Sequence, residues 1–279
     1  MDTNPAPPDA SKVARSARSV AVPPRRRRTI AVTGSASGIG AAVYRRFERS
    51  GARVIGIDLH DAEVVADLSD QAGRAQAVDG VSRRAEGRLD GAVACAGVGP
   101  HVVPTSLIAA VNLFGALSVL DGLLPLLAEG EAPAAVAVGS NSATLSPPDA
   151  ELLRAMGEGD EAAAAARAAE VDGATVYGTS KLALTRALRR RARRWGEAGV
   201  RLNVVAPGPV DTPLLAGGLE DPVLGPLIEA LPVPLGRRAT PDEVAACIGF
   251  LLDPANGFVH GSVLFVDGGS DAMLVPDRI

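Results

Sequence analysis

The feature that most restricts the fold of this sequence is a regular alternation of short apolar segments with longer amphipathic ones, beginning at Thr29. Short apolar runs bounded by turn residues predict buried strands, and apolar residues at helical spacing predict helices between them. Strands that are joined through helices pair in parallel and carry helices on both faces. The sequence therefore predicts an α/β fold, a doubly wound parallel sheet of about seven strands, over residues 29–279.

The expected elements follow this alternation to the end of the chain. Strands are expected at Thr29–Thr33, Arg53–Ile57, Glu63–Ala66, Gly91–Cys95, Ala134–Val138, Arg201–Ala206 and Val263–Val266. Helices are expected at Ile39–Ser50, Asp70–Ala85, Thr105–Ala128, Val176–Ala198 and Pro241–Leu252. In such sheets ligands bind at the carboxyl ends of the strands, near the point where the strand order reverses.

Charge divides the chain into two parts. Residues 1–28 are rich in Pro, Ala, Ser and Arg, with seven basic and two acidic residues, and we interpret them as a disordered basic leader. A transit peptide is the alternative for this segment. The whole chain has a net charge of −4, so residues 29–279 carry −9. An acidic body of this kind argues against nucleic acid as a partner.

The cysteines and histidines exclude two further classes of protein. The two cysteines, Cys95 and Cys247, are far apart, so a disulfide framework is not expected and a cytoplasmic location fits. Three scattered histidines form no zinc pattern, and no metal is expected. We see no apolar run of the length that spans a bilayer, so no membrane partner is expected either.

A glycine-rich turn follows the first strand, in the sequence Thr-Gly-Ser-Ala-Ser-Gly-Ile-Gly over residues 33–40. A strand, a glycine-rich turn and a helix in this order are typical of a Rossmann-type dinucleotide site, where the helix amino end meets a pyrophosphate. Asp58 ends the second strand, 18 residues beyond Gly40, where a carboxylate can bind the adenosine ribose of NAD and repel a 2′-phosphate. A solvated aspartate in a turn is the alternative for Asp58. Asp67 and Leu68 would lie beside the adenine.

Tyr177 and Lys181 are four residues apart in a predicted helix and therefore lie on one face of it. An ammonium group near a phenol lowers the pKa of the phenol, which makes it usable as an acid or base near neutral pH. The chain has 26 arginines and two lysines, and the other lysine, Lys12, is in the leader. An ordinary amphipathic helix with a solvated lysine is the alternative explanation.

Three other polar segments lie where this architecture needs them. Asn112 interrupts an apolar helix, so its buried amide is either structural or part of a proton path. Ser140 follows the fifth strand. The segment Pro207–Thr212 follows the sixth strand, and Thr212 could bond the carboxamide of a nicotinamide. A Ser-His-Asp hydrolase is disfavoured, because no G-x-S-x-G motif is present and the histidines fit no triad order.

These motifs together resemble the short-chain dehydrogenase/reductase family over residues 29–270. The matching parts are T-G-S-A-S-G-I-G, Asn112, Ser140, Tyr177-x-x-x-Lys181, P-G-P-V-D-T and Val266-Asp267-Gly268-Gly269. Within the family, the segments Gly56-Ile57-Asp58, Cys95–Pro100, Trp195–Asn203 and Thr212–Leu215 resemble the bacterial 3α-hydroxysteroid dehydrogenase/carbonyl reductases. The resemblance implies an NAD(H)-dependent oxidoreductase that interconverts a secondary alcohol and a ketone on a bulky lipophilic substrate.

The resemblance also implies the roles of individual residues. Tyr177 would be the acid/base, Lys181 would lower its pKa and bond the nicotinamide ribose, Ser140 would bond the substrate oxygen, and Asn112 would hold a water for proton exchange. Cofactor contacts are expected at Gly34, Ser37, Gly38, Ile39, Gly40, Asp58, Asp67, Leu68, Cys95, Ala96, Gly97, Tyr177, Lys181, Pro207, Gly208, Val210 and Thr212. Substrate contacts are expected at Ser140, Tyr177, Leu214 and Leu215. Cys95 departs from the family's usual Asn, so its contact would be made through the backbone.

Two segments are expected to add to the basic domain. An insertion at about residues 145–173 contains a strong helix former, Glu161–Ala169. It would cover the family's four-helix interface, here Thr105–Ala128 and Val176–Ala198, which leaves a homodimer built on Pro241–Leu252 and Val263–Val266. An insertion that projects outward as a lid extension and leaves both interfaces free is the alternative. An apolar segment at about residues 210–235 would form a substrate lid. Two alternatives remain open: a reductase for a terpenoid or polyketide ketone, and a dinucleotide-sensing protein without catalysis.

Overall fold

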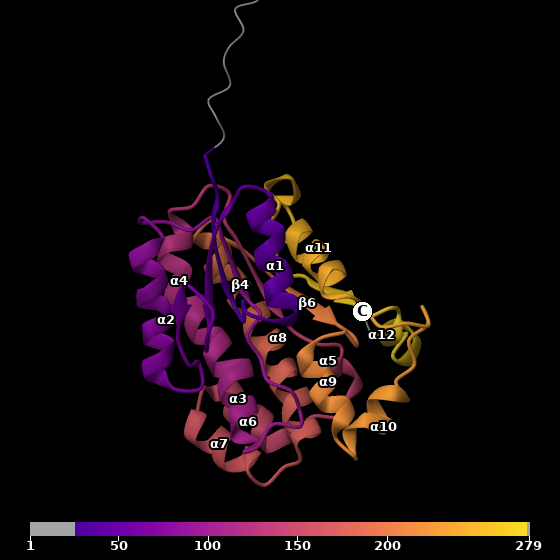
Figure 1. The fold of residues 1–279 in the computed structure, drawn as a ribbon. Coiled ribbons are helices and arrows are strands. Elements are labelled where there is room, and N and C mark those ends of the chain that lie inside the picture. The colour runs from indigo at the N-terminus through magenta and orange to yellow at the C-terminus, as the bar shows by residue number, and fades with distance from the viewer. Residues whose placement is uncertain (1–25, 278–279) are drawn as a thin grey trace, which may run out of the picture.

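Seven parallel strands form one sheet in the order β3-β2-β1-β4-β5-β6-β7, with helices on both faces (Figure 1). The computed structural model describes residues 26–277. Its strands are β1 (Thr29–Thr33), β2 (Arg53–Asp58), β3 (Val64–Val65), β4 (Gly91–Ala94), β5 (Ala134–Val138), β6 (Arg201–Pro207) and β7 (Val263–Val266). This confirms the predicted α/β fold, including the number of strands.

Two hydrophobic layers hold the helices on the sheet. On one face, α1 (Gly38–Arg49) and α11 (Pro241–Leu252) pack against each other and bury residues such as Val43 and Ile248. On the other face lie α2 (Gln71–Arg84), α4 (Ala116–Ala128) and α8 (Gly173–Glu197), whose buried side chains include Trp195. The central strands are buried along their whole length, as expected of parallel strands covered on both faces.

The strand order reverses between β1 and β4. The chain runs from β1 outward to β2 and β3 and then returns to β4 on the other side of β1. The turns that follow β1 and β4 therefore lie next to each other at the carboxyl edge of the sheet. This is the switch point at which doubly wound folds bind their ligands.

The helix that carries Asn112 differs from the prediction of one continuous helix over Thr105–Ala128. It consists of α3 (Ser106–Ala109), a π-helix, η2 (Ala110–Gly115), and α4. A π-turn adds one residue to a turn and is frequent at functional sites. The stretch Ser106–Ala128 is also long and apolar enough to cross a membrane, contrary to our expectation, but more than half of its most apolar part is buried inside the protein. It is a core helix.

The insertion before α8 folds into two main helices rather than the single one expected. After the short α5 (Ser142–Leu145) come α6 (Ala150–Glu158), which packs against α8, and α7 (Glu161–Ala168), which packs against α3 (Figure 1). The side chains of Asp149, Asp160 and Asp172 cap the amino ends of α6, α7 and α8. Buried residues of α6 and α7 join the main core, so the insertion is part of the domain.

The remaining segments complete the ends and one side of the domain. Helices α9 (Pro213–Glu220) and α10 (Leu224–Glu229) lie in the segment for which we predict a lid, and they are followed by η3 (Pro254–Asn256) and α12 (Ser270–Leu274). Arg28 donates hydrogen bonds to the carbonyl oxygens of Asp90 and Leu252, so the contacts of the domain include a residue before Thr29. Most of the predicted leader, residues 1–25, lies outside the described residues.

Candidate active site

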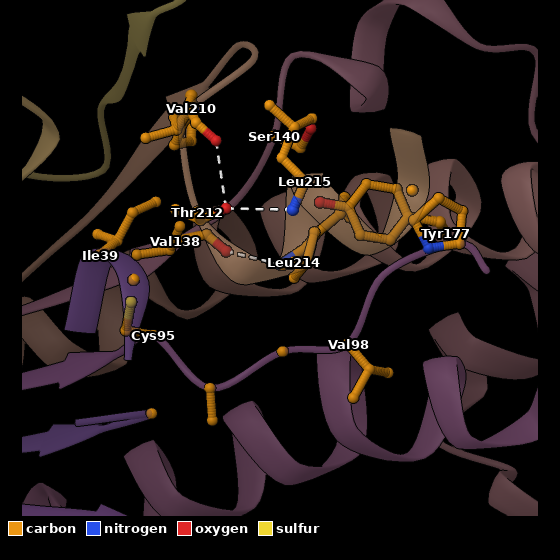
Figure 2. Close-up of a pocket in the computed structure, with 18 of the residues that line it drawn as sticks. Ile39, Cys95, Val98, Val138, Ser140, Tyr177, Val210, Thr212, Leu214 and Leu215 are labelled. Carbon is orange, nitrogen blue, oxygen red and sulfur yellow. Dashed lines mark hydrogen bonds between the residues drawn. The ribbon is translucent and has the colours of Figure 1, made fainter. Parts of the chain in front are cut away.

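A cavity of about 500 Å³ opens at the carboxyl edge of the sheet, between the turns after the strands and the lid helices. Figure 2 shows Ile39 and Cys95 on one side of it and Tyr177 and Ser140 on the other. The expected cofactor and substrate residues all line this cavity, and Asn112 is the one predicted site residue outside its lining. The structure therefore brings together side chains that lie far apart in the sequence.

The glycine-rich turn is shaped for close approach of a ligand to the backbone. Gly34 has a φ of +69°, and a Cβ atom there would lie 2.8 Å from the Cα atom of Ala96. At Gly40 a Cβ atom would lie 1.9 Å from the carbonyl oxygen of Gly34. The Ser37 side chain makes no cap for α1, so the amino end of this helix presents free amides to the cavity. This arrangement fits a pyrophosphate.

Asp58 lies at the end of β2 with its carboxylate held by two backbone amides. The amide of Ala36 donates to Oδ2 at 2.9 Å, and the amide of Leu59 donates to Oδ1 at 2.7 Å. Each oxygen keeps a further lone pair for another donor. A carboxylate fixed in this way at the mouth of the cavity suits a pair of ribose hydroxyls, as expected from the sequence.

The turn after β4 is tied to β1 by one hydroxyl. Thr33 Oγ1 accepts hydrogen bonds of 3.0 Å from the amides of both Cys95 and Ala96. Burial raises the pKa of the Cys95 thiol to about 12. The thiol is thus protonated at neutral pH and is no nucleophile, which agrees with a contact made through the backbone.

Tyr177 and Lys181 lie one turn apart on α8 and face the same end of the cavity. The Lys181 ammonium lies 5.7 Å from the centroid of the Tyr177 ring. Its Nζ donates a 2.9 Å hydrogen bond to the carbonyl oxygen of Val138, the last residue of β5. Both side chains lie in the first three turns of α8, whose amino end is capped by Asp172 at the end of the insertion.

The pKa of Tyr177 differs from the sequence-based expectation that Lys181 lowers it. Burial, which disfavours the phenolate, raises the pKa of Tyr177 above 10, while a hydrogen bond with Ser140 acts in the opposite, lowering direction. Burial also lowers the pKa of Lys181 to about 8. In this structure desolvation is therefore the largest cause of both shifts.

Ser140 is positioned by a second serine that the sequence analysis missed. Ser142 donates from its Oγ to Ser140 Oγ at 2.9 Å, and its amide donates to the same oxygen at 3.2 Å. With both bonds accepted, the Ser140 proton is free to be donated toward the cavity. The close repeat of serines after β5 was the available sequence signal.

Asn112 holds the turn after β4 rather than lining the cavity. Its Nδ2 donates to the carbonyl oxygen of Val98 at 3.0 Å, and its Oδ1 accepts from the Val98 amide at 2.8 Å. A Cβ atom on Gly97 would lie 3.1 Å from Asn112 Oδ1 and 3.6 Å from Lys181 Nζ. The structural part of the predicted role is visible here, and the water-holding part stays a prediction.

The lid segment supplies the apolar wall of the cavity. Thr212 caps α9 by accepting from the Leu215 amide at 3.2 Å, and it donates to the carbonyl oxygen of Val210 (Figure 2). The hydroxyl keeps one acceptor site, which a carboxamide N–H could use. The wall itself consists of aliphatic residues: Leu214, Leu215, Leu224, Leu227, Ile228 and Leu231. Leu219 and Val223, which belong to the same apolar segment, are not part of the lining.

Two family models match the chain, one on each side of α6. Residues 28–151 match the model described as short chain dehydrogenase, and residues 161–271 match the model described as enoyl-(acyl carrier protein) reductase. Residues 152–160, which neither match includes, belong to the insertion.

Several known proteins are similar over nearly the whole chain. The 3-alpha-hydroxysteroid dehydrogenase/carbonyl reductase of Comamonas testosteroni is 46% identical over 253 residues, which cover 89% of this chain and 98% of the relative. The cis-4-hydroxycyclohexanecarboxylate dehydrogenase of Sinomonas cyclohexanicum is 32% identical over 271 residues, covering 88% and 97%. The crystal structure of the 3-alpha-hydroxysteroid dehydrogenase from Pseudomonas sp. B-0831 complexed with NADH superposes with a TM-score of 0.87 at 47% identity, covering 90% of this chain and 100% of that one.

Proposed function

We propose that this protein, which belongs to the short-chain dehydrogenase/reductase family, interconverts a secondary alcohol and a ketone with NAD(H). Membership of this family makes it an oxidoreductase. One observation carries this proposal. Tyr177, Lys181 and Ser140 meet at one end of a cavity whose other end is formed by the glycine-rich turn and Asp58. A dinucleotide that occupies one end thus reaches a general acid/base at the other.

The fit of NAD to this cavity rests on the chain's own backbone. The turn at Gly34 and Gly40 has no room for side chains, and the amino end of α1 faces the same space. Among the described residues that line the cavity there is no arginine or lysine near Asp58 to pair with a 2′-phosphate. The NADH complex of the Pseudomonas relative supports the same choice of cofactor.

The proposed chemistry assigns each polar group one task. NAD⁺ held by the glycine-rich turn and Asp58 would supply the acceptor for the hydride of the carbinol carbon. The Tyr177 phenolate accepts the hydroxyl proton of the alcohol, and in the reverse direction the phenol returns it to the ketone oxygen. Ser140 donates a hydrogen bond to that oxygen, which stabilises the negative charge developing there. Lys181, held by the Val138 carbonyl, keeps a cation beside Tyr177, and Asn112 would hold a water for proton exchange.

The substrate class follows from the apolar lid. The aliphatic wall from Leu214 to Leu231 suits a bulky lipophilic ring system and offers little to a charged or sugar-like substrate. The Comamonas and Pseudomonas relatives are 3-alpha-hydroxysteroid dehydrogenases by name, which supports a 3α-hydroxysteroid as the substrate. The test is NADH formation from a panel of 3α-hydroxysteroids and simpler cyclic secondary alcohols, with turnover of the steroids expected to be most efficient.

The proposed assembly is a homodimer in the cytoplasm. Helices α6 and α7 pack on α8 and on the α3–η2 segment, the elements of the family's four-helix interface. Strand β7 is an edge of the sheet. Phe250 of α11 is half exposed, and Phe258, which precedes β7 in the chain, is fully exposed. An apolar edge of this kind supports pairing between two copies.

Cys95 and Cys247 are both free thiols, which fits the proposed reducing compartment, the cytoplasm.

A further inference from the structure

Arg74 of α2 is one of the few fully buried charged side chains in the described part of the chain, with 3% of its surface exposed. Its guanidinium makes hydrogen bonds in three directions. Nε donates to the Leu68 carbonyl oxygen at 2.8 Å, and Nη2 donates to the carbonyl oxygens of Ser69 at 3.0 Å and Ala110 at 3.1 Å. A buried cation with this many carbonyl acceptors fixes the backbone around it.

The charge of Arg74 is balanced from the insertion. Glu161, the first residue of α7, accepts from Nη1 at 2.8 Å and from Nη2 at 2.6 Å, which makes a two-point ion pair. The side chain of Glu161 is 33% exposed, whereas that of Arg74 is 4% exposed. The pair therefore links a helix of the insertion to the interior beside the cofactor cavity.

The carbonyl groups that Arg74 holds belong to the adenosine end of the cavity. Leu68 and the preceding Asp67 line the cavity, and Ser69 continues the same turn. Ala110, whose carbonyl oxygen also accepts from Arg74, is the first residue of the π-helix. The turn also lies close against this helix, since a Cβ atom on Gly115 would be 2.9 Å from the Leu68 carbonyl oxygen. Arg74 thus joins the turn to the helix.

We propose that Arg74 and Glu161 are positioning residues for the adenosine half of the cofactor, so that the insertion contributes to NAD affinity. Glu161 holds Arg74, and Arg74 holds the Asp67–Ser69 turn in the shape that borders the adenine site. Without the carboxylate, a buried guanidinium lacks its counter-charge and moves toward water, which releases the carbonyls of the turn. This inference rests on the proposed function, because it assumes that NAD occupies the cavity.

The experiment compares Glu161→Gln with a matched control in the same insertion. Arg167 forms a similar two-point ion pair with Asp149, at 3.1 and 2.7 Å, but touches no residue of the cofactor cavity. Arg167 is more exposed than Arg74 and also pairs with Glu151 and Glu170. Arg167→Gln therefore removes ion pairs of the insertion without releasing the turn. The dissociation constant of NADH is measured by fluorescence titration for the wild type and both variants, and the melting temperature of each is recorded.

We expect Glu161→Gln to raise the dissociation constant of NADH about tenfold, as the loss of one charged hydrogen bond would. The KM for NAD⁺ should rise by a similar factor while kcat stays within about twofold. With reduced nicotinamide mononucleotide, which lacks the adenosine, the variant and the wild type should perform equally. Arg167→Gln should bind NADH as the wild type does.

Three results would overturn the inference, and they differ from failure of the proposed function. Unchanged NADH affinity in Glu161→Gln would show that the ion pair does not position the turn. If Arg167→Gln weakened NADH binding as much as Glu161→Gln does, only the stability of the insertion would matter. The same would follow if Glu161→Gln lost as much activity with reduced nicotinamide mononucleotide as with NADH. A wild-type protein that binds no NADH would refute the proposed function itself, and the inference with it.

Discussion

The ammonium nitrogen of Lys181 lies 5.7 Å from the centroid of the Tyr177 ring, and the Val138 carbonyl oxygen holds it there through a 2.9 Å hydrogen bond. The strand end and the helix are therefore locked together by one buried contact. This contact keeps a cation beside the only tyrosine that faces the cavity lined by the described residues. Removal of the Tyr177 hydroxyl is therefore the most direct test of the proposed acid/base.

Tyr177→Phe should lower kcat by roughly 10²- to 10⁴-fold, the usual effect of losing a positioned acid/base. The ring is kept, so the affinity for NADH should stay near that of the wild type. Steady-state kinetics and a fluorescence titration measure the two quantities. Tyr44→Phe is the matched control, because Tyr44 bonds Glu63 at the surface and not the cavity. Near wild-type kcat in Tyr177→Phe at saturating substrate would refute the assignment.

Ser140→Ala should shift the pH profile of alcohol oxidation toward higher pH. The hydrogen bond with Ser140 lowers the pKa of Tyr177, so its loss raises that pKa. Alcohol oxidation needs the Tyr177 phenolate, so its rate should rise at a higher pH than in the wild type. Ketone reduction needs the phenol, so its rate should be kept up to a higher pH. The rate at the optimum should also fall by about 10².

The readout for Ser140 is kcat/KM against pH in both directions. Ser140→Thr keeps a hydroxyl and should keep the wild-type midpoint. If the alanine and threonine variants share the wild-type midpoint, Ser140 does not act on the Tyr177 pKa.

Much of the fold could be predicted because burial pattern alone defines it. The strands β1, β5 and β7 and helix α11 begin and end where the sequence predicts. The cofactor and substrate residues proposed from the sequence all line one cavity, because parallel strands bring their carboxyl ends to one edge.

The details that failed depend on tertiary contacts that no local pattern contains. The π-turn at Ala110–Gly115 has no signal in its apolar sequence, and Arg74 bonds one of its carbonyls only in the folded chain. The direction of the Tyr177 pKa shift was wrong because helical spacing gives a neighbouring charge but not the degree of burial. The role of Ser142 was missed, since its partner is another side chain two residues away.

Asp58→Ala should weaken NAD⁺ binding by roughly ten- to a hundredfold, since charged hydrogen bonds contribute about 1.5–3 kcal/mol. NADP⁺ binding should change little or improve, because the carboxylate that repels a 2′-phosphate is gone. Titration of the wild type and the variant with both cofactors gives the ratio of the dissociation constants for NAD⁺ and NADP⁺. Asp61→Asn is the control for a nearby exposed aspartate, which pairs with His60 instead. A wild type that prefers NADP⁺ would contradict this account of Asp58.

Light scattering at micromolar concentration should give a dimer. Phe258→Asp, or the double change with Phe250→Asp, places charge on the exposed apolar edge near β7 and should produce monomers. Arg190→Glu on the exposed face of α8 is the control and should leave the dimer intact. A stable tetramer, or monomers from the α8 variant alone, would show that the insertion does not displace the family's four-helix interface.

The most direct test of the central claim is the absorbance of NADH at its nicotinamide band when the purified protein is given NAD⁺ and a 3α-hydroxysteroid. The account predicts steady formation of NADH and the matching ketone by the wild type and by Tyr44→Phe. It predicts a rate lower by at least about 10² in Tyr177→Phe, and little product with NADP⁺. A wild type that binds NADH but oxidises no 3α-hydroxysteroid or other cyclic secondary alcohol on the panel would contradict it.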